Sequence, residues 1–299
     1  MKILVQNRDR NTHFGGDQVQ VDNYVKSLIN LGHDAIYSCD SNLDLSSYDE
    51  VWLVHINYDW SWRQYQNIRK YNKQYRLFAM YYPWHVHNSQ EQMKELLSNS
   101  IATYALSNVE KGEMISGMQL NQEQSDKIIT IPNGIDETIF YKDELPKEDF
   151  IMSSGRYESL KGFDCIAKAA QELNLKVKFF GSLGDALFKE QLQSNYPNAE
   201  CYDNLSQIEL ADYLRKCRLY VCASHGDRFH MGMSEALACG ARVVNSPQTR
   251  GNEWFPGITI AEPNNNEELK AAILKEWNQL GAEYTFNIQT WNDVIKSII

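Results

Sequence analysis

The sequence predicts an α/β protein made of two doubly wound, Rossmann-like domains in series. Short apolar segments alternate with longer amphipathic segments in the first half, and the same scheme restarts in the second half. Between the halves lies YKDELPKED (Tyr141–Asp149), a charged segment with a proline and no periodicity. Apolar strands that alternate with helices form parallel sheets covered on both faces. A cleft between two such domains is the expected ligand site.

The expected strands are short apolar runs bounded by polar or turn-forming residues. In the first half they are Lys2–Gln6, Asp34–Ser38, Val51–Ile56, Leu77–Tyr82, Ile101–Leu106 and Ile128–Ile131. In the second half they are Phe150–Ser153, Val177–Phe180, Leu219–Ala223 and Val243–Asn245. The charged segment places the first domain over residues 1–144.

Helices are expected between several of these strands. The clearest signal is a set of apolar residues at i, i+3, i+4 and i+7 within Gln18–Leu31, which would line one helix face. Periodic apolar residues also predict helices in the second half, near Phe163–Leu173, Gln207–Lys216 and Ser234–Cys239.

The composition restricts the partners. A net charge of -10 argues against nucleic-acid binding through a general basic surface, and weakly against docking on anionic membranes. Six cysteines are scattered singly, without CxxC or Cys/His ligand spacing, which indicates thiols in a reducing compartment. The opening MKILVQNRDR is too short an apolar run for a signal peptide, and no run approaches the roughly 18 residues of a membrane span. We therefore expect a cytoplasmic protein.

One loop of the second half carries the features of a phosphate site. Within SSGRYESLKGFD, Arg156 and Lys161 lie between Gly155, which follows a strand, and a second glycine at a helix start. Two fixed cations beside free helix amides suit a pyrophosphate, because they neutralise the charge that grows on a leaving group. A further strand, FFGSLGD, ends at Gly181 and adds glycine backbone to the same sheet edge.

Two acids follow in HGDRFHMGMSEALACG. Asp227 lies in the loop after an apolar strand, and Glu235 lies in the first turns of the next helix, with His230, Met231 and Gly232 between them. An acid at a helix start can simply complement the helix dipole. It can also accept hydrogen bonds from paired ribose or sugar hydroxyls. Cations, acids and glycines at one sheet edge together fit a nucleotide.

In the first half, THFGGDQVQ (Thr12–Gln20) places Gly15 and Gly16 where a strand turns into a helix. Glycines there let the backbone approach a ligand and leave helix amides available. The stretch is not GxGxxG, so neither a dinucleotide fingerprint nor an oxidoreductase is supported.

Taken in order, these stretches resemble the motifs of retaining glycosyltransferases of the GT-B fold, in particular glycosyltransferase family 4. The resemblance covers nearly the whole chain. The stretches that carry it are Gly15–Gly16, LGHD (Leu31–Asp34), IPNGID (Ile131–Asp136), GRYESLKGFD, the E-x7-E-like spacing from Asp227 to Glu235 with EALACGARVV, TRGNEW (Thr249–Trp254) and TWNDVIKSII (Thr290–Ile299). The last is similar to the family's C-terminal helix, which crosses back to the first domain. The resemblance therefore implies a donor domain over 145–280 and a returning segment over 281–299.

The resemblance implies transfer of a sugar from a nucleotide diphosphate to an acceptor, with retention of configuration, no bound metal and no cofactor besides the donor substrate. Arg156 and Lys161 would hold the diphosphate, Glu235 the ribose, and Asp227 the donor sugar. The remaining donor contacts would come from Gly15, Gly16, Gly155, Gly181, His230, Met231 and Gly232. A UDP- or GDP-linked donor is expected. No protein nucleophile is implied, because the family's leaving phosphate assists deprotonation of the acceptor.

Several residues depart from the family pattern. Asp227 replaces the first glutamate, which shortens its reach by one methylene, and His230 stands where a glycine usually follows the phenylalanine. The TRGNEW loop keeps a single glycine where the family has two. The family's His–Asp pair after a first-domain strand corresponds to YYPWHVH, where His85 is the candidate and His87 the alternative.

The acceptor, whether a carbohydrate, a lipid-linked molecule or another compound, is expected on the first domain. Tyr58–Arg76 is basic, aromatic and amphipathic, so it could meet a membrane peripherally or stack on sugars. A solvated helix with one apolar face explains it more simply. Two other functions are kept: a sugar-nucleotide epimerase or hydrolase on the same fold, and a non-catalytic sugar-nucleotide binding protein.

Overall fold

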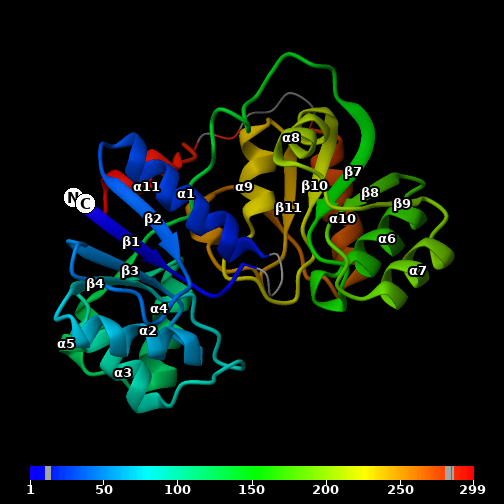
Figure 1. Cartoon of the computed structure of the whole chain (residues 1–299). Helices are drawn as coiled ribbons and strands as arrows, with labels where there is room; N and C mark the ends of the chain where they lie inside the picture. Colours follow the sequence, from blue (N-terminus) through cyan, green and yellow to red (C-terminus); the bar gives the residue numbers. More distant parts are fainter. Residues whose placement is uncertain (11–14, 280–283, 285) are drawn as a thin grey trace. The chain divides into compact units, whose positions relative to one another are not determined.

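The computed structural model describes residues 1–10, 15–279, 284 and 286–299. The chain forms two compact units (Figure 1). Unit 1 contains residues 1–134 and 289–299, and unit 2 contains residues 135–288. The expected boundary near residue 144 stays a prediction. The boundary at 280/281 and the residues Thr12, His13 and Phe14 of the THFGG stretch lie outside the described residues.

Unit 1 is built on a six-stranded parallel sheet in the order β2-β1-β3-β4-β5-β6. The strands are β1 Lys2–Gln6, β2 Asp34–Ser38, β3 Glu50–Val54, β4 Gln74–Phe78, β5 Thr103–Ala105 and β6 Ile128–Thr130. The helices are α1 Gly16–Asn30, α2 Asp59–Lys70, α3 Gln90–Asn99, α4 Asn108–Met118, α5 Gln122–Asp126 and α11 Trp291–Lys296. Helices α1 and α11 lie on one face of the sheet, and α2, α3 and α4 lie on the other (Figure 1).

Unit 2 holds a second six-stranded parallel sheet in the order β12-β11-β10-β7-β8-β9. Its strands are β7 Glu148–Ser154, β8 Lys176–Phe180, β9 Ala199–Tyr202, β10 Cys217–Val221, β11 Arg242–Asn245 and β12 Thr259–Ile260. Its α-helices are α6 Phe163–Glu172, α7 Ala186–Asn195, α8 Gln207–Lys216, α9 Met231–Ala238 and α10 Asn266–Trp277, with short 3-10 turns at Ser159–Lys161 and Asn252–Trp254. From β7 the chain adds strands in one direction across the sheet, to β8 and β9, and from β10 it adds them in the other, to β11 and β12. The switch point of the sheet therefore lies between β7 and β10.

The predicted fold class is confirmed, because both sheets are parallel and carry helices on both faces. Strand β4 covers Gln74–Phe78 and not the expected Leu77–Tyr82, and three further details differ. The edge strands β9 and β12 were not expected, since AECY and the two-residue β12 lack a continuous apolar run. Strand β7 begins at Glu148, inside the segment expected to be linker, where Asp149 forms an ion pair with Arg218. Helix α9 begins at Met231, before the expected Ser234.

The C-terminal helix α11 completes an aromatic core on the α1 face of unit 1. The ring of Tyr24 contacts Trp52 and Phe78 of the sheet and also Trp291 of α11, with ring centroids 4.7 to 5.7 Å apart. Gly134 lies against the start of α11. A Cβ atom at Gly134 would lie 2.4 Å from the backbone nitrogen of Trp291. Only a residue without a side chain permits this contact.

We expect Gly134→Ala to destabilise the protein by about 2 kcal/mol, because its methyl group must displace the backbone of α11. Gly112→Ala in α4 is the matched control, since a Cβ there meets nothing within 4 Å. It should be neutral or stabilising by up to about 1 kcal/mol. Urea unfolding of both variants measures this, and equal stability of Gly134→Ala and the unmodified chain would contradict the close contact.

Candidate functional site

The candidate site of unit 2 lies at the carboxyl ends of the three neighbouring strands β8, β7 and β10. The loop after β7 carries both predicted cations, and the loop after β10 carries the predicted acid Asp227. The loops are joined by backbone: the amide of His225 donates to the carbonyl of Leu160 over 2.8 Å. In an open parallel sheet, the crevice beside the switch point is the usual ligand position.

Lys161 and Asp227 form the ion pair that connects these two loops. The Lys161 ammonium lies 2.8 Å from Oδ1 and 3.0 Å from Oδ2 of Asp227. Both side chains are more than four-fifths covered. An ammonium has three N–H donors, so two can serve the carboxylate and one can serve another acceptor.

Each member of the pair holds the other in its charged form. Burial alone would raise the pKa of Asp227, but the Lys161 ammonium attracts the ionised carboxylate and the net effect lowers that pKa. Burial would lower the pKa of Lys161, and Asp227 reverses this, so the Lys161 pKa is raised. The pair therefore stays ionised at neutral pH.

The second predicted cation, Arg156, is also paired. Its Nη2 atom lies 2.9 Å from Oε1 of Glu158, two residues further along the same loop. The Arg156 side chain is 45% exposed, whereas that of Lys161 is 15% exposed. An exposed arginine pair is weak, so the guanidinium can exchange Glu158 for a stronger anion.

The glycines of the site permit close backbone contacts. A Cβ at Gly181 would lie 1.6 Å from the carbonyl oxygen of Gly155, so the ends of β7 and β8 touch through their backbones. Gly155 itself has φ +155 and packs on the stem of Lys161. At Gly232 a Cβ would meet the hydroxyls of Ser154 and Tyr220 at 2.5 Å. Gly155, Gly181 and Gly232 thus bring the start of α9 and the end of β7 together.

His230 forms the N-cap of α9. Its Nδ1 accepts a hydrogen bond from the Met233 amide over 3.2 Å, which explains why the helix already begins at Met231. Burial lowers the pKa of His230 to about 4. The ring is therefore neutral at pH 7, with its hydrogen on Nε2, and can donate one hydrogen bond.

Glu235 lies in the second turn of α9 and is 8% exposed. Burial raises its pKa to about 7. A carboxyl group with this pKa changes charge close to neutral pH, so a ligand that hydrogen-bonds to the carboxylate would shift it to the ionised form.

Among the described residues, one cluster brings potential metal ligands together: Cys222, Asp227 and His230, whose ligand atoms lie within 4.8 Å of one another. Its chemistry does not suit a cation. Asp227 already holds the Lys161 ammonium, Nδ1 of His230 accepts from the α9 backbone, and burial raises the pKa of Cys222 to about 12.

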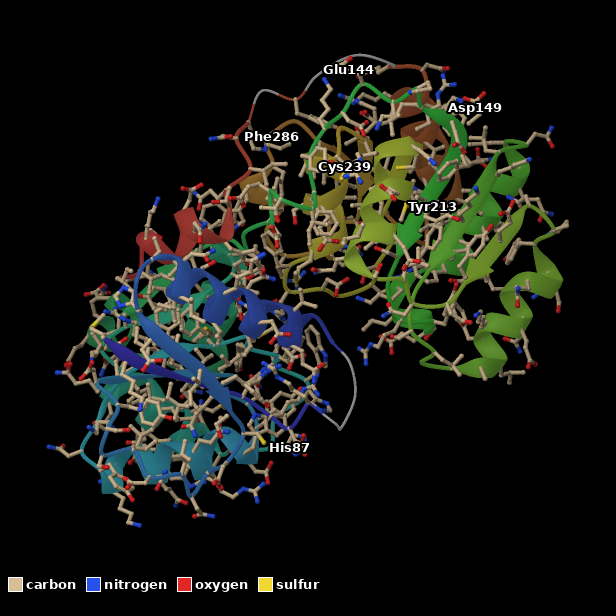
Figure 2. All side chains as sticks on the ribbon, turned by 45° about the horizontal axis from the view of Figure 1, so that its top comes forward. His87, Glu144, Asp149, Tyr213, Cys239 and Phe286 are labelled. Carbon is tan, nitrogen blue, oxygen red and sulfur yellow. The ribbon has the colours of Figure 1, made fainter. Side chains whose placement is uncertain are left out.

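The predicted residues of unit 1 lie in the segments that follow β1 and β4. Gly15 is the extended residue before α1, and a Cβ there would lie 2.7 Å from the Asp17 carboxylate; Gly16 is the first residue of α1. His85 and His87 are both exposed and lie in the loop after β4, with their Nε2 atoms 3.4 Å apart. His87 is labelled in Figure 2. Helix α2 covers most of Tyr58–Arg76, and its cations Arg63 and Arg69 pair with Asp59 and Glu95.

Sequence reasoning missed Ser154 and Tyr220, whose hydroxyls lie 2.9 Å apart beside Gly232. It also missed Arg8, Asp17 and His55, which meet in unit 1. Polar residues directly after apolar strands were the available signal for Arg8 and His55.

The fold is that of the GT-B glycosyltransferases. Sucrose-phosphate synthase from Thermosynechococcus elongatus matches with a TM-score of 0.76 at 16% identity, over 98% of this chain and 92% of that chain. Alr3699/HepE from Anabaena, solved in complex with UDP and glucose, matches with a TM-score of 0.71 at 13% identity, over 100% of this chain and 94% of that one. At these identities the likeness shows the fold alone.

Residues 148–279, which make up most of unit 2, match the family model described as Glycosyl transferases group 1. An uncharacterized glycosyltransferase of Methanocaldococcus jannaschii is 27% identical over 196 residues, 60% of this chain and 54% of the relative. The GtfA subunit of the UDP-N-acetylglucosamine–peptide N-acetylglucosaminyltransferase of Streptococcus pneumoniae is 22% identical over 258 residues, 81% of this chain and 48% of the relative. The chain thus spans about half the length of both relatives. The resemblance seen in the sequence is confirmed for the fold, and residues 148–279 carry the group 1 domain.

In the part of the chain that the structure describes, no helix is both long and apolar enough to cross a membrane.

We expect Asp227→Asn to destabilise the protein by about 2 kcal/mol at pH 7, because it leaves the Lys161 ammonium covered without its counterion. The Asp227 pKa is lowered by folding, so its contribution is present above the ordinary value of 3.8 and is lost as the pH falls through the folded value. Urea unfolding should therefore show a stability difference that shrinks at acid pH.

Asp203→Asn is the matched control for this prediction. Asp203 pairs with Lys189 at 2.7 Å but its side chain is 90% exposed, so its removal should cost less than about 1 kcal/mol. Equal losses in the two variants would show that the Lys161–Asp227 pair has no special structural role.

Proposed function

We propose that this chain is a retaining glycosyltransferase that takes a sugar from a nucleotide-diphosphate donor, without a bound metal. The observation that carries the proposal is the charge arrangement at the switch point of unit 2. There, cations and acids from the loops after β7 and β10 lie beside glycine backbone at one edge of a group 1 domain. A sugar nucleotide offers a diphosphate to the cations and hydroxyls to the acids.

Each residue has a role in this proposal. Lys161 directs its remaining N–H, and Arg156 its guanidinium, at the diphosphate, whose negative charge grows as the sugar leaves. Glu235 accepts hydrogen bonds from the ribose hydroxyls in its ionised form. Asp227 faces the donor sugar while it fixes Lys161, and the neutral His230 donates from Nε2.

The reaction follows from this division of roles. The bond between the anomeric carbon and the diphosphate oxygen breaks, and the acceptor oxygen forms a new bond on the same face. The hydrogen of the acceptor hydroxyl passes to the departing phosphate. The protein supplies position and electrostatic stabilisation, so no side-chain nucleophile is needed.

Relatives and neighbours support this choice of donor. Alr3699/HepE was solved with UDP and with UDP-glucose, and the GtfA subunit carries UDP-N-acetylglucosamine in its name. UDP-linked donors are therefore the first to test, followed by GDP-linked ones. An epimerase or hydrolase on the same fold would release product without an acceptor, and a binding protein would release none.

We expect UDP- or GDP-sugars to raise the melting temperature and to be hydrolysed slowly in the absence of an acceptor. Hydrolysis of the best donor should fall at least about 100-fold in Arg156→Ala and in Lys161→Ala, since each loses a cation that stabilises the leaving group. Lys168→Ala, which removes an exposed cation of α6, is the control and should hydrolyse the donor normally. If no nucleotide and no nucleotide-sugar shifts the melting temperature of the protein, the proposal is wrong.

Donor affinity should also depend on pH through Glu235. Its pKa is raised to about 7 by burial, and the proposed ribose contact favours the ionised form, so donor binding releases a proton below pH 7. Affinity should rise about tenfold between pH 6 and pH 8. Calorimetry with UDP-glucose measures this without interference, since its diphosphate stays fully ionised across that range. Glu235→Gln should bind with no such pH dependence, and an unchanged dependence in that variant would exclude the role of Glu235.

A further inference from the structure

Two hydroxyl groups lie side by side at the switch point of unit 2. Ser154 is the last residue of β7, and Tyr220 lies in the neighbouring strand β10. The Ser154 and Tyr220 hydroxyl oxygens are 2.9 Å apart, and the Ser154 amide also donates to the Tyr220 oxygen over 3.3 Å. Neither hydroxyl has a role in the donor contacts proposed above.

The burial of Tyr220 fixes the direction of the hydrogen bond between the two hydroxyls. Tyr220 is fully buried, and burial raises the pKa of its hydroxyl well above the ordinary value, so the hydroxyl keeps its hydrogen. Among the described residues, the acceptor for that hydrogen is the Ser154 oxygen. A buried donor without an acceptor is costly, so Tyr220 donates to Ser154 and not the reverse.

Ser154 is therefore left with a hydrogen of its own to donate. Its oxygen accepts from Tyr220, and in the part of the chain that the structure describes its hydroxyl has no further hydrogen-bond partner. Ser154 is partly exposed at the carboxyl end of β7, whereas Tyr220 is covered. A hydroxyl that accepts one hydrogen bond becomes a stronger donor of the next. The two hydroxyls thus end in a polarised donor at the edge of the sheet.

Ser154 lies between the cations and the second acid of the candidate site. On one side it precedes Gly155, which packs on the stem of Lys161. On the other side lies Gly232 in the first turn of α9, where a Cβ would be 2.5 Å from the Ser154 oxygen. Glu235 follows in the next turn of α9. A nucleotide that reaches from Lys161 to Glu235 would therefore pass Ser154 with the phosphate attached to its ribose.

A phosphate oxygen is the group that suits this donor. Phosphate oxygens accept hydrogen bonds and carry charge, and hydrogen bonds to charged acceptors are about twice as strong as neutral ones. A ribose hydroxyl has a hydrogen to donate as well, and Glu235 is the nearer carboxylate acceptor on α9 for that purpose. The free hydrogen of Ser154 therefore favours the phosphate over the ribose.

We propose that Ser154 donates a hydrogen bond to the phosphate attached to the ribose, and that Tyr220 positions the Ser154 hydroxyl for this contact. The assignment rests on the proposed nucleotide-sugar donor. The charge of that phosphate changes little in the reaction, because the breaking bond joins the sugar to the other phosphate. Ser154 should therefore stabilise the bound substrate and the transition state equally, which lowers KM without raising kcat.

Calorimetric titration of the full chain with UDP, UMP and uridine tests the phosphate contact, and the guanosine series replaces them if only guanosine nucleotides bind. Ser154→Ala should weaken the binding of UDP and UMP about tenfold, because a hydrogen bond to a charged group is lost, and should leave uridine binding unchanged. Ser194→Ala, which removes an exposed hydroxyl of α7, is the matched control and should bind all three normally. Undiminished UDP binding by Ser154→Ala, or an equal loss for uridine, would overturn the proposal.

Tyr220→Phe tests the positioning role, because it keeps the buried ring and removes the hydroxyl. UDP binding should fall about threefold in Tyr220→Phe, and adding this change to Ser154→Ala should cause no further loss. Losses that add in the double variant would show that Tyr220 acts apart from Ser154, and its positioning role would be wrong.

The kinetics of donor hydrolysis separate this contact from the proposed function. Ser154→Ala should raise KM for UDP-glucose about tenfold and change kcat by less than about twofold, whereas Lys161→Ala should lower kcat. A fall in kcat comparable to that of Lys161→Ala would overturn the role given to Ser154. If UDP binds through Ser154 but no sugar nucleotide is turned over, the transferase proposal fails and the phosphate contact stands. If UDP-glucose is turned over with the same KM in Ser154→Ala, the contact alone fails.

Discussion

The ion pair between Lys161 and Asp227 is the contact on which the candidate site depends. It joins residues 66 positions apart, one from the loop after β7 and one from the loop after β10, across the switch point of unit 2. The Asp227 carboxylate neutralises the Lys161 ammonium. Lys161 therefore does not attract anions through an uncompensated charge. An anion that binds there must therefore match the geometry of the loop as well as its charge, which favours selectivity over raw affinity.

The departures at Asp227 and His230 are explained together by the local packing. The short carboxylate of Asp227 is engaged by Lys161, and the imidazole of His230 caps α9 while Gly232 leaves room for the hydroxyls of Ser154 and Tyr220. A histidine here thus supplies both the helix cap and a donor on Nε2. Glu235 lies one turn further along the helix. Burial raises its pKa to about 7, so a ligand that contacts the carboxylate can change its charge.

Much of the fold could be predicted from periodicity, because a buried strand such as β3 and an amphipathic helix such as α1 leave regular patterns. The site was predictable only as a set of candidates. Sequence places Lys161 and Asp227 in different loops, and only the strand order makes those loops neighbours. The role of His230 was hidden because Ser234 is the stronger capping signal. His55 follows an apolar strand, but its backbone conformation and its Nδ1 atom, which is unpaired among the described residues, appear only in three dimensions.

The return of α11 to unit 1 also bears on the order of folding. Unit 2 is one continuous stretch of chain, whereas the aromatic core around Tyr24 needs Trp291 from beyond that stretch. On a ribosome that releases the chain from its N-terminus, unit 2 can complete its core while unit 1 still lacks a helix. Until residues 289–299 emerge, the α1 face of the first sheet exposes apolar surface, and during that interval a chaperone or a neighbouring nascent chain could occupy the position of α11.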